Sequence, residues 1–219
     1  MNQLIDRDIR QRDIIPPEKL ATISATIVGT GAIGRQVTIQ LAAIGTPRLK
    51  LIDFDRVEVE NLAPQGFLEQ DMGLSKVDAV ERICKSINSS VDITTTCRKF
   101  NTTQFTGGVL FCCVDGIETR RNIFNTVKNR ANLFVDGRMS AEYMRIFTSH
   151  NDASRTHYES TLFSETEAYN GSCTAKTTIY CASIAAGLMV AQFTKWLRGH
   201  DLDNEIDVNL LTNEMGFKN

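Results

Sequence analysis

The sequence predicts an α/β fold: a Rossmann-like, mainly parallel sheet with helices on both faces and antiparallel strands near the C-terminus. Strand patterns alternate with helix patterns up to residue 135, as in right-handed strand–helix–strand units. Residues 109–114 form an unbroken apolar run, which is typical of a strand buried on both faces. From residue 143 the pattern changes to a strand, a polar loop, a long apolar helix over 177–197 and a last strand over 207–211. We expect the last strand to close the sheet antiparallel.

Proline, glycine and helix-period apolar positions define the first elements. Pro16-Pro17 predicts the start of a short helix, because proline is favoured in a first helical turn. An apolar strand begins at residue 24 and leads through a glycine-rich turn to a helix over 36–44 and a second strand over 49–52. Residues 56–73 are polar and rich in turn formers. A helix over 76–87 follows, because its apolar residues recur on one face.

Three further strands follow this helix. Residues 91–96 alternate and are β-branched, 109–114 are apolar throughout, and a short strand over 133–135 follows a helix over 118–129. Asp53, Asp115 and Asp136 each come directly after a strand. Because the carboxyl ends of parallel strands meet at one edge of a sheet, we expect these acids beside the glycine-rich turn, where such folds bind ligands.

Length and composition favour one domain over residues 1–219, with an N-terminal arm at 1–15 and a mobile loop at 151–172. The net charge of −2 is spread along the chain and predicts neither general nucleic-acid binding nor membrane binding. No signal peptide pattern is present, and the longest apolar stretch is too short to span a bilayer. The six cysteines include no Cys-x-x-Cys pair, which predicts free thiols in a reducing cytoplasm and no structural zinc.

The glycine-rich turn is a nucleotide-binding pattern. Gly29, Gly31 and Gly34 occupy Gly-x-Gly-x-x-Gly; the first two allow close approach of a phosphate, and the third lets the helix pack on the strand. The start of the helix, with Ala32 and Ile33, presents free N–H groups to an anion. A carboxylate at Asp53 can accept both hydroxyls of a ribose. We infer an adenine-nucleotide site, the alternative being a glycine turn that serves packing alone.

Several motifs, in order, resemble the ThiF and MoeB family, which is related to the adenylating half of ubiquitin-activating enzymes. The resemblance covers roughly residues 7–198. Its motifs are Arg7-x-x-Arg10-Gln11, the glycine loop, Asp53-Phe-Asp55, Asn61-Leu62, Gly73-x-x-Lys76 and Asp115 followed by Thr119-Arg120. Each motif is weak alone, and their shared order and spacing are specific.

The resemblance implies that ATP, with magnesium, adenylates the C-terminal carboxylate of a ubiquitin-like or sulfur-carrier protein, in a homodimer. We expect the acyl substrate to lie near residues 143–147 and the 151–172 loop. The implied roles are a phosphate contact for Lys76, a magnesium ligand at Asp115, a ribose contact for Asp53, orientation of phosphate or metal by Asn61, action in trans by Arg10, and nucleotide contacts by Asp55 and Gln65.

These residues also have structural interpretations. Lys76 could be a solvated residue of a first helical turn, and Asp115 could cap the next helix, where aspartate is favoured. Arg10 could belong to a solvated arm, and Asn61 could serve a turn. Cys173 precedes the long helix in a polar stretch, like the mobile-loop cysteine that binds the carrier covalently in sulfur-carrier activators; packing at a helix start is the alternative.

The chain departs from the family at Pro64, where Asn-Leu-x-Arg-Gln normally places a phosphate-binding arginine. Proline offers neither charge nor backbone donor. Either Arg35 or Arg56 substitutes, and Arg35 is the first candidate because it follows Gly34 directly, or catalysis is weak. Two other functions therefore stay open: an NAD-binding oxidoreductase, which leaves Lys76 and Arg10 unexplained, and a degenerate relative that only binds a partner.

Overall fold

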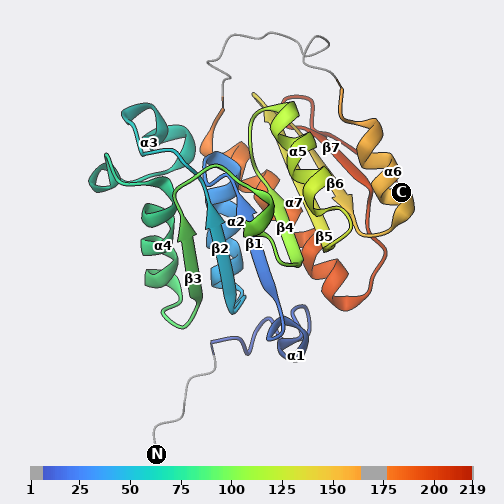
Figure 1. Cartoon of the computed structure of the whole chain (residues 1–219), viewed down its shortest axis with the longest axis horizontal. Helices are drawn as coiled ribbons and strands as arrows, with labels where there is room; N and C mark the ends of the chain where they lie inside the picture. The colour runs from blue at the N-terminus through green and yellow to red at the C-terminus, as the bar shows by residue number, and fades with distance from the viewer. Residues whose placement is uncertain (1–6, 164–176, 219) are drawn as a thin grey trace, which may run out of the picture.

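A computed structural model describes residues 7–163 and 177–218. The strands of both segments form one eight-stranded sheet (Figure 1). The strand order is β3-β2-β1-β4-β5-β6-β7-β8, and the first five of these strands run parallel. The others pair antiparallel. This confirms the predicted fold class. The strands are β1 (Ser24–Val28), β2 (Arg48–Ile52), β3 (Asp92–Thr96), β4 (Gly108–Cys112), β5 (Ala131–Ser140), β6 (Tyr143–Ser149), β7 (Glu205–Asn209) and β8 (Glu214–Lys218).

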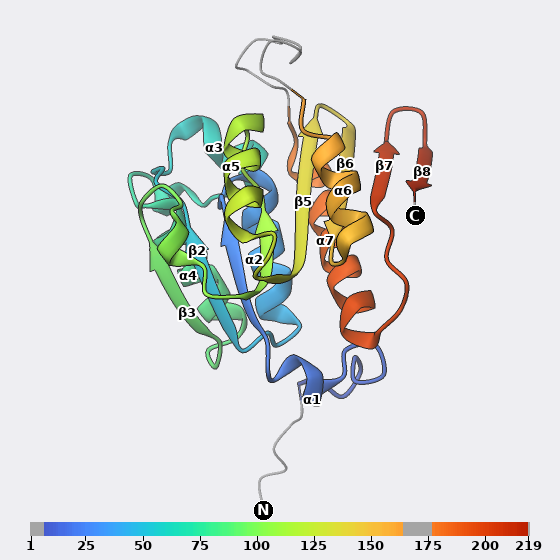
Figure 2. The same cartoon turned by 45° about the vertical axis from the view of Figure 1, so that its right-hand side comes forward.

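Helices cover both faces of this sheet (Figures 1 and 2). On one face lie α2 (Ala32–Ala43), α4 (Lys76–Ile87) and α7 (Ile179–Arg198), and on the other α5 (Ile117–Val127) and α6 (Asp152–Ser160). The shorter segments are α1 (Pro17–Leu20), α3 (Val59–Gln65) and two 3-10 turns, η1 (Glu69–Asp71) and η2 (Thr102–Gln104).

Each face of the sheet has its own apolar core, because successive strand residues point to opposite faces. Ile27 and Leu51 pack toward α2, α4 and α7, whereas their neighbours Val28 and Ile52 pack toward the core formed with α5 and α6. All four are buried. The central strand β4 therefore carries no polar side chain at any position, which is the pattern that predicted it.

The expectation of a mobile loop over 151–172 is wrong for its first part, because residues 152–160 form α6. Asn151 caps this helix by accepting a hydrogen bond from Ser154 N at 2.9 Å. Tyr158 is fully buried and packs its ring against Phe124 and Phe134. One buried aromatic residue thus holds an otherwise polar helix on the sheet. The rest of the expected loop, apart from residues 161–163, lies outside the described residues, as does Cys173.

Other boundaries also differ from the expectations. The polar stretch 56–73 contains α3 and η1, and α2 begins at residue 32, directly after the glycine loop. The strand expected at 133–135 continues to Ser140, because β6 pairs back along it in a hairpin. The last predicted strand is β7, and β8, which the sequence pattern did not indicate, follows it. All five residues of β8 are exposed, so no buried face marks it in the sequence.

The described part of the N-terminal arm packs against the C-terminal end of α2. Arg7 donates a hydrogen bond to Ala43 O at 3.3 Å, and Gln11 Nε2 donates to Ile44 O at 3.0 Å. Arg10 between them is exposed. The arm therefore lies at the end of α2 opposite the glycine loop. In the described part of the chain, no helix combines the length and apolar character needed to cross a membrane.

Candidate nucleotide site

The glycine loop connects β1 to α2, and two of its glycines are required by close contacts. Gly29 has a φ of +86°, and a Cβ there would lie 2.5 Å from Cys113 O. A Cβ on Gly34 would lie 1.8 Å from Gly29 O, so only glycine lets the helix start so close to the strand. Gly31 is different, since an added Cβ would meet only the Gln65 side chain, at 3.5 Å. The second glycine therefore leaves the backbone open to a ligand.

Asp53 fastens this loop to the end of β2. Its carboxylate is 8% exposed and accepts hydrogen bonds from Thr30 N at 2.6 Å and from Thr30 Oγ1 at 3.1 Å. Its other oxygen accepts a hydrogen bond from Asp55 N at 2.9 Å. Each carboxylate oxygen has lone pairs beyond those used here. Asp53 thus orders the loop at the place where a ribose contact is expected.

Lys76 is held at the first position of α4. Its ammonium lies 3.0 Å from Asp55 Oδ2, and its backbone N donates to Asp55 O at 3.0 Å. The Lys76 side chain is 8% exposed, whereas that of Asp55 is 46% exposed. A solvated surface lysine does not fit this geometry. Because Asp55 also bonds to Asp53, the ammonium is linked through two acids to the glycine loop.

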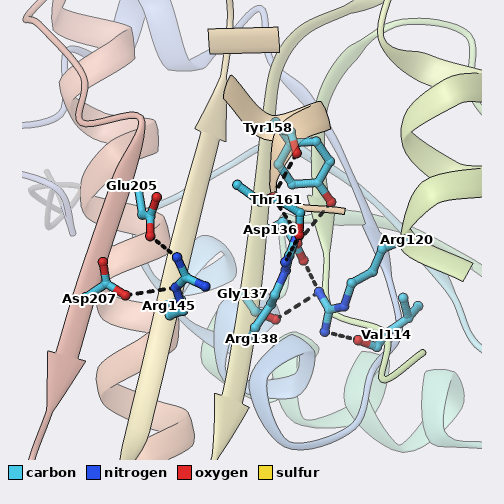
Figure 3. Close-up of polar contacts among 10 residues, drawn as sticks. All are labelled: Val114, Arg120, Asp136, Gly137, Arg138, Arg145, Tyr158, Thr161, Glu205 and Asp207. Carbon is cyan, nitrogen blue, oxygen red and sulfur yellow. Dashed lines mark hydrogen bonds and ion pairs between the residues drawn. The ribbon is translucent and has the colours of Figure 1, made fainter. Parts of the chain in front are cut away.

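Asp115 lies just past the end of β4 and is exposed. Gly116, not Asp115, is the N-cap of α5, so the capping interpretation is not seen. Asp115 makes no hydrogen bond or ion pair with any described residue, and a carboxylate of this kind suits Mg²⁺, which prefers oxygen ligands and keeps few protein contacts. The backbone just before Asp115 is held in place by α5, because the Arg120 side chain donates a hydrogen bond to Val114 O (Figure 3).

Asn61 and Gln65 both belong to α3, and their side chains have different surroundings. Asn61 Oδ1 accepts a hydrogen bond from Glu58 N at 3.0 Å, so Asn61 does have the local role considered as an alternative. Gln65 Oε1 is buried beside Gly31 and has no partner among the described residues. A buried polar atom without a partner is costly. A buried amide oxygen of this kind beside an open loop is suited to a hydrogen bond with a ligand.

Arg35 and Arg56 are the two candidates for the charge that Pro64 does not supply, and the structure separates them. Arg56 is exposed and donates to Gly73 O at 2.8 Å. Arg35 is 6% exposed, and its side chain has no hydrogen bond or ion pair within the described residues. Burial lowers the pKa of its guanidinium from the usual value, and the Phe67 ring lies 5.4 Å away. Arg35 is therefore a buried cation without an acid.

Arg10 cannot reach the glycine loop of its own chain. The arm that carries it packs at residues 43 and 44, beyond the C-terminal end of the 12-residue α2. A helix of this length spans about 18 Å. Any contribution of Arg10 to a nucleotide site must therefore be made to another copy of the chain.

The sequence placed Asp136 at the ligand edge, and Asp136 does pair with Cys112, the last residue of β4, but its carboxylate is not available to a ligand. Asp136 is fully buried, pairs with Arg120 and with Arg138 Nε at 2.8 Å, and accepts from Tyr158 Oη at 3.0 Å (Figure 3). Arg138 also donates to Thr161 O, so the cluster joins β5 to α5 and to the end of α6. The carboxylate is thereby fully used in holding elements together.

A second ion cluster on β6 and β7 was also missed. Arg145 lies between Glu205 and Asp207 (Figure 3), and His157 Nε2 of α6 lies 2.9 Å from Glu205. Burial favours the neutral carboxyl of Glu205, but hydrogen bonds from Arg145 and Lys218 outweigh it and lower its pKa to about 2. Polar residues alternating along 205–209 were the available signal, although spacing alone does not show which charges meet.

The chain belongs to the ThiF family, whose model matches residues 5–218, and this confirms the resemblance. Ubiquitin-like modifier-activating enzyme 5 of Aedes aegypti is 31% identical over 133 residues, which cover 53% of this chain and 33% of that protein. The chain therefore spans about a third of that relative.

Two solved structures share the fold. PaaA superposes with a TM-score of 0.78 at 19% identity, covering 100% of this chain and 85% of that one. Escherichia coli MccB with AMPCPP and selenomethionine MccA gives a TM-score of 0.72 at 18% identity, covering 92% of this chain and 65% of that one. At these identities the likeness concerns the fold.

Proposed function

We propose that this protein is an ATP-dependent adenylyltransferase that activates the C-terminal carboxylate of a ubiquitin-like protein, a sulfur-carrier protein or a peptide. Family membership supports this proposal, as do the name of the mosquito relative and the AMPCPP and MccA found with MccB. The observation that carries it is the sheet edge where an open glycine loop, the fixed ammonium of Lys76 and the unpaired carboxylate of Asp115 follow neighbouring strands.

In the proposed reaction, a carboxylate oxygen of the substrate attacks the α-phosphorus of ATP. A new P–O bond forms, the bond to the bridging oxygen breaks, and its electron pair leaves with pyrophosphate. The backbone N–H groups after Gly31 orient the phosphates, and Lys76 offsets the developing charge. Asp115 would hold Mg²⁺, which supplies charge neutralisation at the phosphate oxygens when bound. Asp53 would accept the ribose hydroxyls, with Asn61 and Gln65 beside the phosphates.

The proposal includes a homodimer, because Arg10 can act only on a second copy. It also includes Cys173 as a candidate acceptor of the activated acyl group. In that step the thiolate attacks the acyl carbon, a thioester forms and AMP leaves. A protein-linked adduct that is absent in Cys173→Ser would support the step, and an unchanged adduct would remove it.

Magnesium-dependent ATP–pyrophosphate exchange, measured with candidate carrier proteins and peptides, tests the proposed reaction. We expect Asp115→Asn to lower exchange by about 10²–10³-fold, the effect of removing one transition-state charge contact, without lowering the melting temperature, since Asp115 has no described partner. Asp152→Asn is the matched control, because Asp152 is an exposed acid at the start of α6, on a different element.

Two outcomes would contradict the proposal. Binding of NAD without any dependence on magnesium would favour an oxidoreductase. Tight binding of a carrier protein without exchange would indicate a relative that has kept the fold and lost the chemistry, which the proline at position 64 makes a real alternative.

A further inference from the structure

Arg35 is the one cation near the glycine loop whose charge the described residues leave uncompensated. Lys76 has Asp55, and Arg56 is exposed to water and bonded to a carbonyl. Arg35 is 6% exposed, and no acid or carbonyl of the described residues accepts a hydrogen bond from its side chain. A guanidinium stays charged in a protein, so its burial without an acid disfavours the folded state.

The surroundings of Arg35 are arranged to admit its side chain. Phe67 provides an aromatic face 5.4 Å from the guanidinium carbon, which orients the planar group without neutralising it. Gly66 ends α3 with a φ of +76°, and a Cβ there would lie 3.1 Å from Arg35 Nη1 and 2.6 Å from Ile179 Cδ1. The tip of Arg35 thus lies against the peptide that follows Gln65.

The side-chain amide of Gln65, next to this peptide, is the other polar group of this region that has an atom without a partner. The Gln65 amide faces Gly31 on the open side of the loop, and its Oε1 is buried without a partner. A 180° rotation of an amide exchanges its oxygen and nitrogen, so Gln65 can present either an acceptor or a donor there. An unpaired cation and an unpaired amide therefore flank one helix N-terminus, which itself favours anions.

We propose that Arg35 binds the phosphates of the nucleotide and supplies the charge that Pro64 does not. The inference rests on the proposed function, since it names a binding residue for that reaction. In the family pattern the phosphate-binding arginine would belong to α3, at the position of Pro64. In this chain the guanidinium of Arg35 would take its place, since it extends from α2 to Gly66 at the end of α3. Binding of a polyphosphate would then compensate the buried guanidinium, and the apo protein carries the cost of keeping it there.

This arrangement predicts opposite effects on stability and on binding, which a purely structural arginine would not produce. Arg35→Met keeps much of the apolar stem and removes the charge. We expect the melting temperature of the apo protein to stay or rise, while the stabilisation by ATP or by inorganic pyrophosphate is lost and exchange falls at least about 100-fold. Arg35→Lys keeps the charge without the planar fork and should retain part of the binding.

Two further variants complete the experiment. Arg56→Met is the matched control and should leave binding and exchange unchanged. In Arg35→Met, the second change Pro64→Arg returns a cation to α3, and we expect it to restore exchange at least about tenfold over the single variant. A melting-temperature rise with pyrophosphate that is equal in Arg35→Met and wild type would overturn the inference. So would a lowered apo melting temperature without any loss of binding.

The design separates this inference from the proposed function. If wild-type protein shows no exchange with any carrier but Arg35→Met abolishes its stabilisation by ATP and pyrophosphate, the adenylation proposal fails and the phosphate role of Arg35 stands. If wild type exchanges and Arg35→Met does so equally well, the role of Arg35 fails and adenylation stands.

Discussion

The parallel and antiparallel halves of the sheet treat charge differently. In the antiparallel half, which begins with the hairpin of β5 and β6, buried acids meet arginines: Asp136 lies between Arg120 and Arg138, and Arg145 lies between Glu205 and Asp207. At the edge of the parallel half, Arg35 is buried without an acid and Asp115 has no described partner. The apolar cores on both faces of the sheet contain residues of both halves, so the difference is not one of packing.

This difference separates charges that hold the fold from charges that are available to a ligand. A buried carboxylate that is ion-paired with two arginines already has its charge compensated, so it has little interaction free energy to gain from a ligand. An unpaired group beside an open glycine loop has interaction free energy still to gain. The comparison therefore predicts that changes in the antiparallel half act on stability, and that changes at the parallel edge act on binding.

The largest effect on stability is expected at Asp136. Asp136→Ala leaves Arg120 and Arg138 facing each other without an acid, and we expect the free energy of unfolding in urea to fall by about 3–5 kcal/mol. Asp152→Ala is the control, because its pair with Arg155 is at the surface and should contribute less than about 0.5 kcal/mol. A loss at Asp136 no greater than at Asp152 would remove the distinction between the two halves.

A smaller effect, dependent on pH, is expected at Glu205. Its folded pKa of about 2 lies below the ordinary 4.5, so above pH 4.5 its interactions contribute fully to stability, and this contribution is lost as the pH falls toward 2. Glu205→Gln should lower the free energy of unfolding at pH 7 by about 2 kcal/mol and flatten its decline between pH 4.5 and 2. Thermal unfolding at several pH values measures the loss at pH 7 and the decline below pH 4.5. A decline equally steep in Glu205→Gln and wild type would contradict the lowered pKa of Glu205.

The smallest effect on folding is expected at Asn61, on the parallel side. Asn61→Asp keeps an acceptor for Glu58 N and adds a negative charge near a helix start, so the free energy of unfolding should change by less than about 0.5 kcal/mol. The same charge should weaken ATP binding if Asn61 lies beside the phosphates, as proposed. Isothermal titration with ATP decides this, since equal affinities in the variant and wild type would place Asn61 in a capping role alone.

The strands of the parallel half and the glycine loop could be predicted because their causes are local. A strand buried on both faces, such as β4, is mostly apolar, and the contact that requires Gly34, with Gly29 O, lies within one turn. Helix α6 could not be predicted in this way. Its sequence is polar, and it is held by Tyr158 in a core built from residues of α5 and β5. The exposed strand β8 had no buried face to signal it.

The candidate site divides along the same line. Gly31, Asp53 and Lys76 were recognised because a motif places each directly after a strand or at a helix start. Asp136 also follows a strand pattern, yet its partner Arg120 is 16 residues away, and nothing in the local sequence shows that the two meet. Position along the chain therefore identified an acid near the sheet edge. It did not show whether the carboxylate was already ion-paired.

The sequence by itself determined the alternation of strands and helices, the glycine loop and the family, because short-range spacing and backbone sterics govern all three. Only the tertiary structure decided which charges are neutralised. That depends on distances between side chains far apart in the chain, since Coulomb interactions and desolvation act through space. For this reason the sequence could name Arg35 only as one of two candidates, and its burial without a described acid distinguishes it from Arg56.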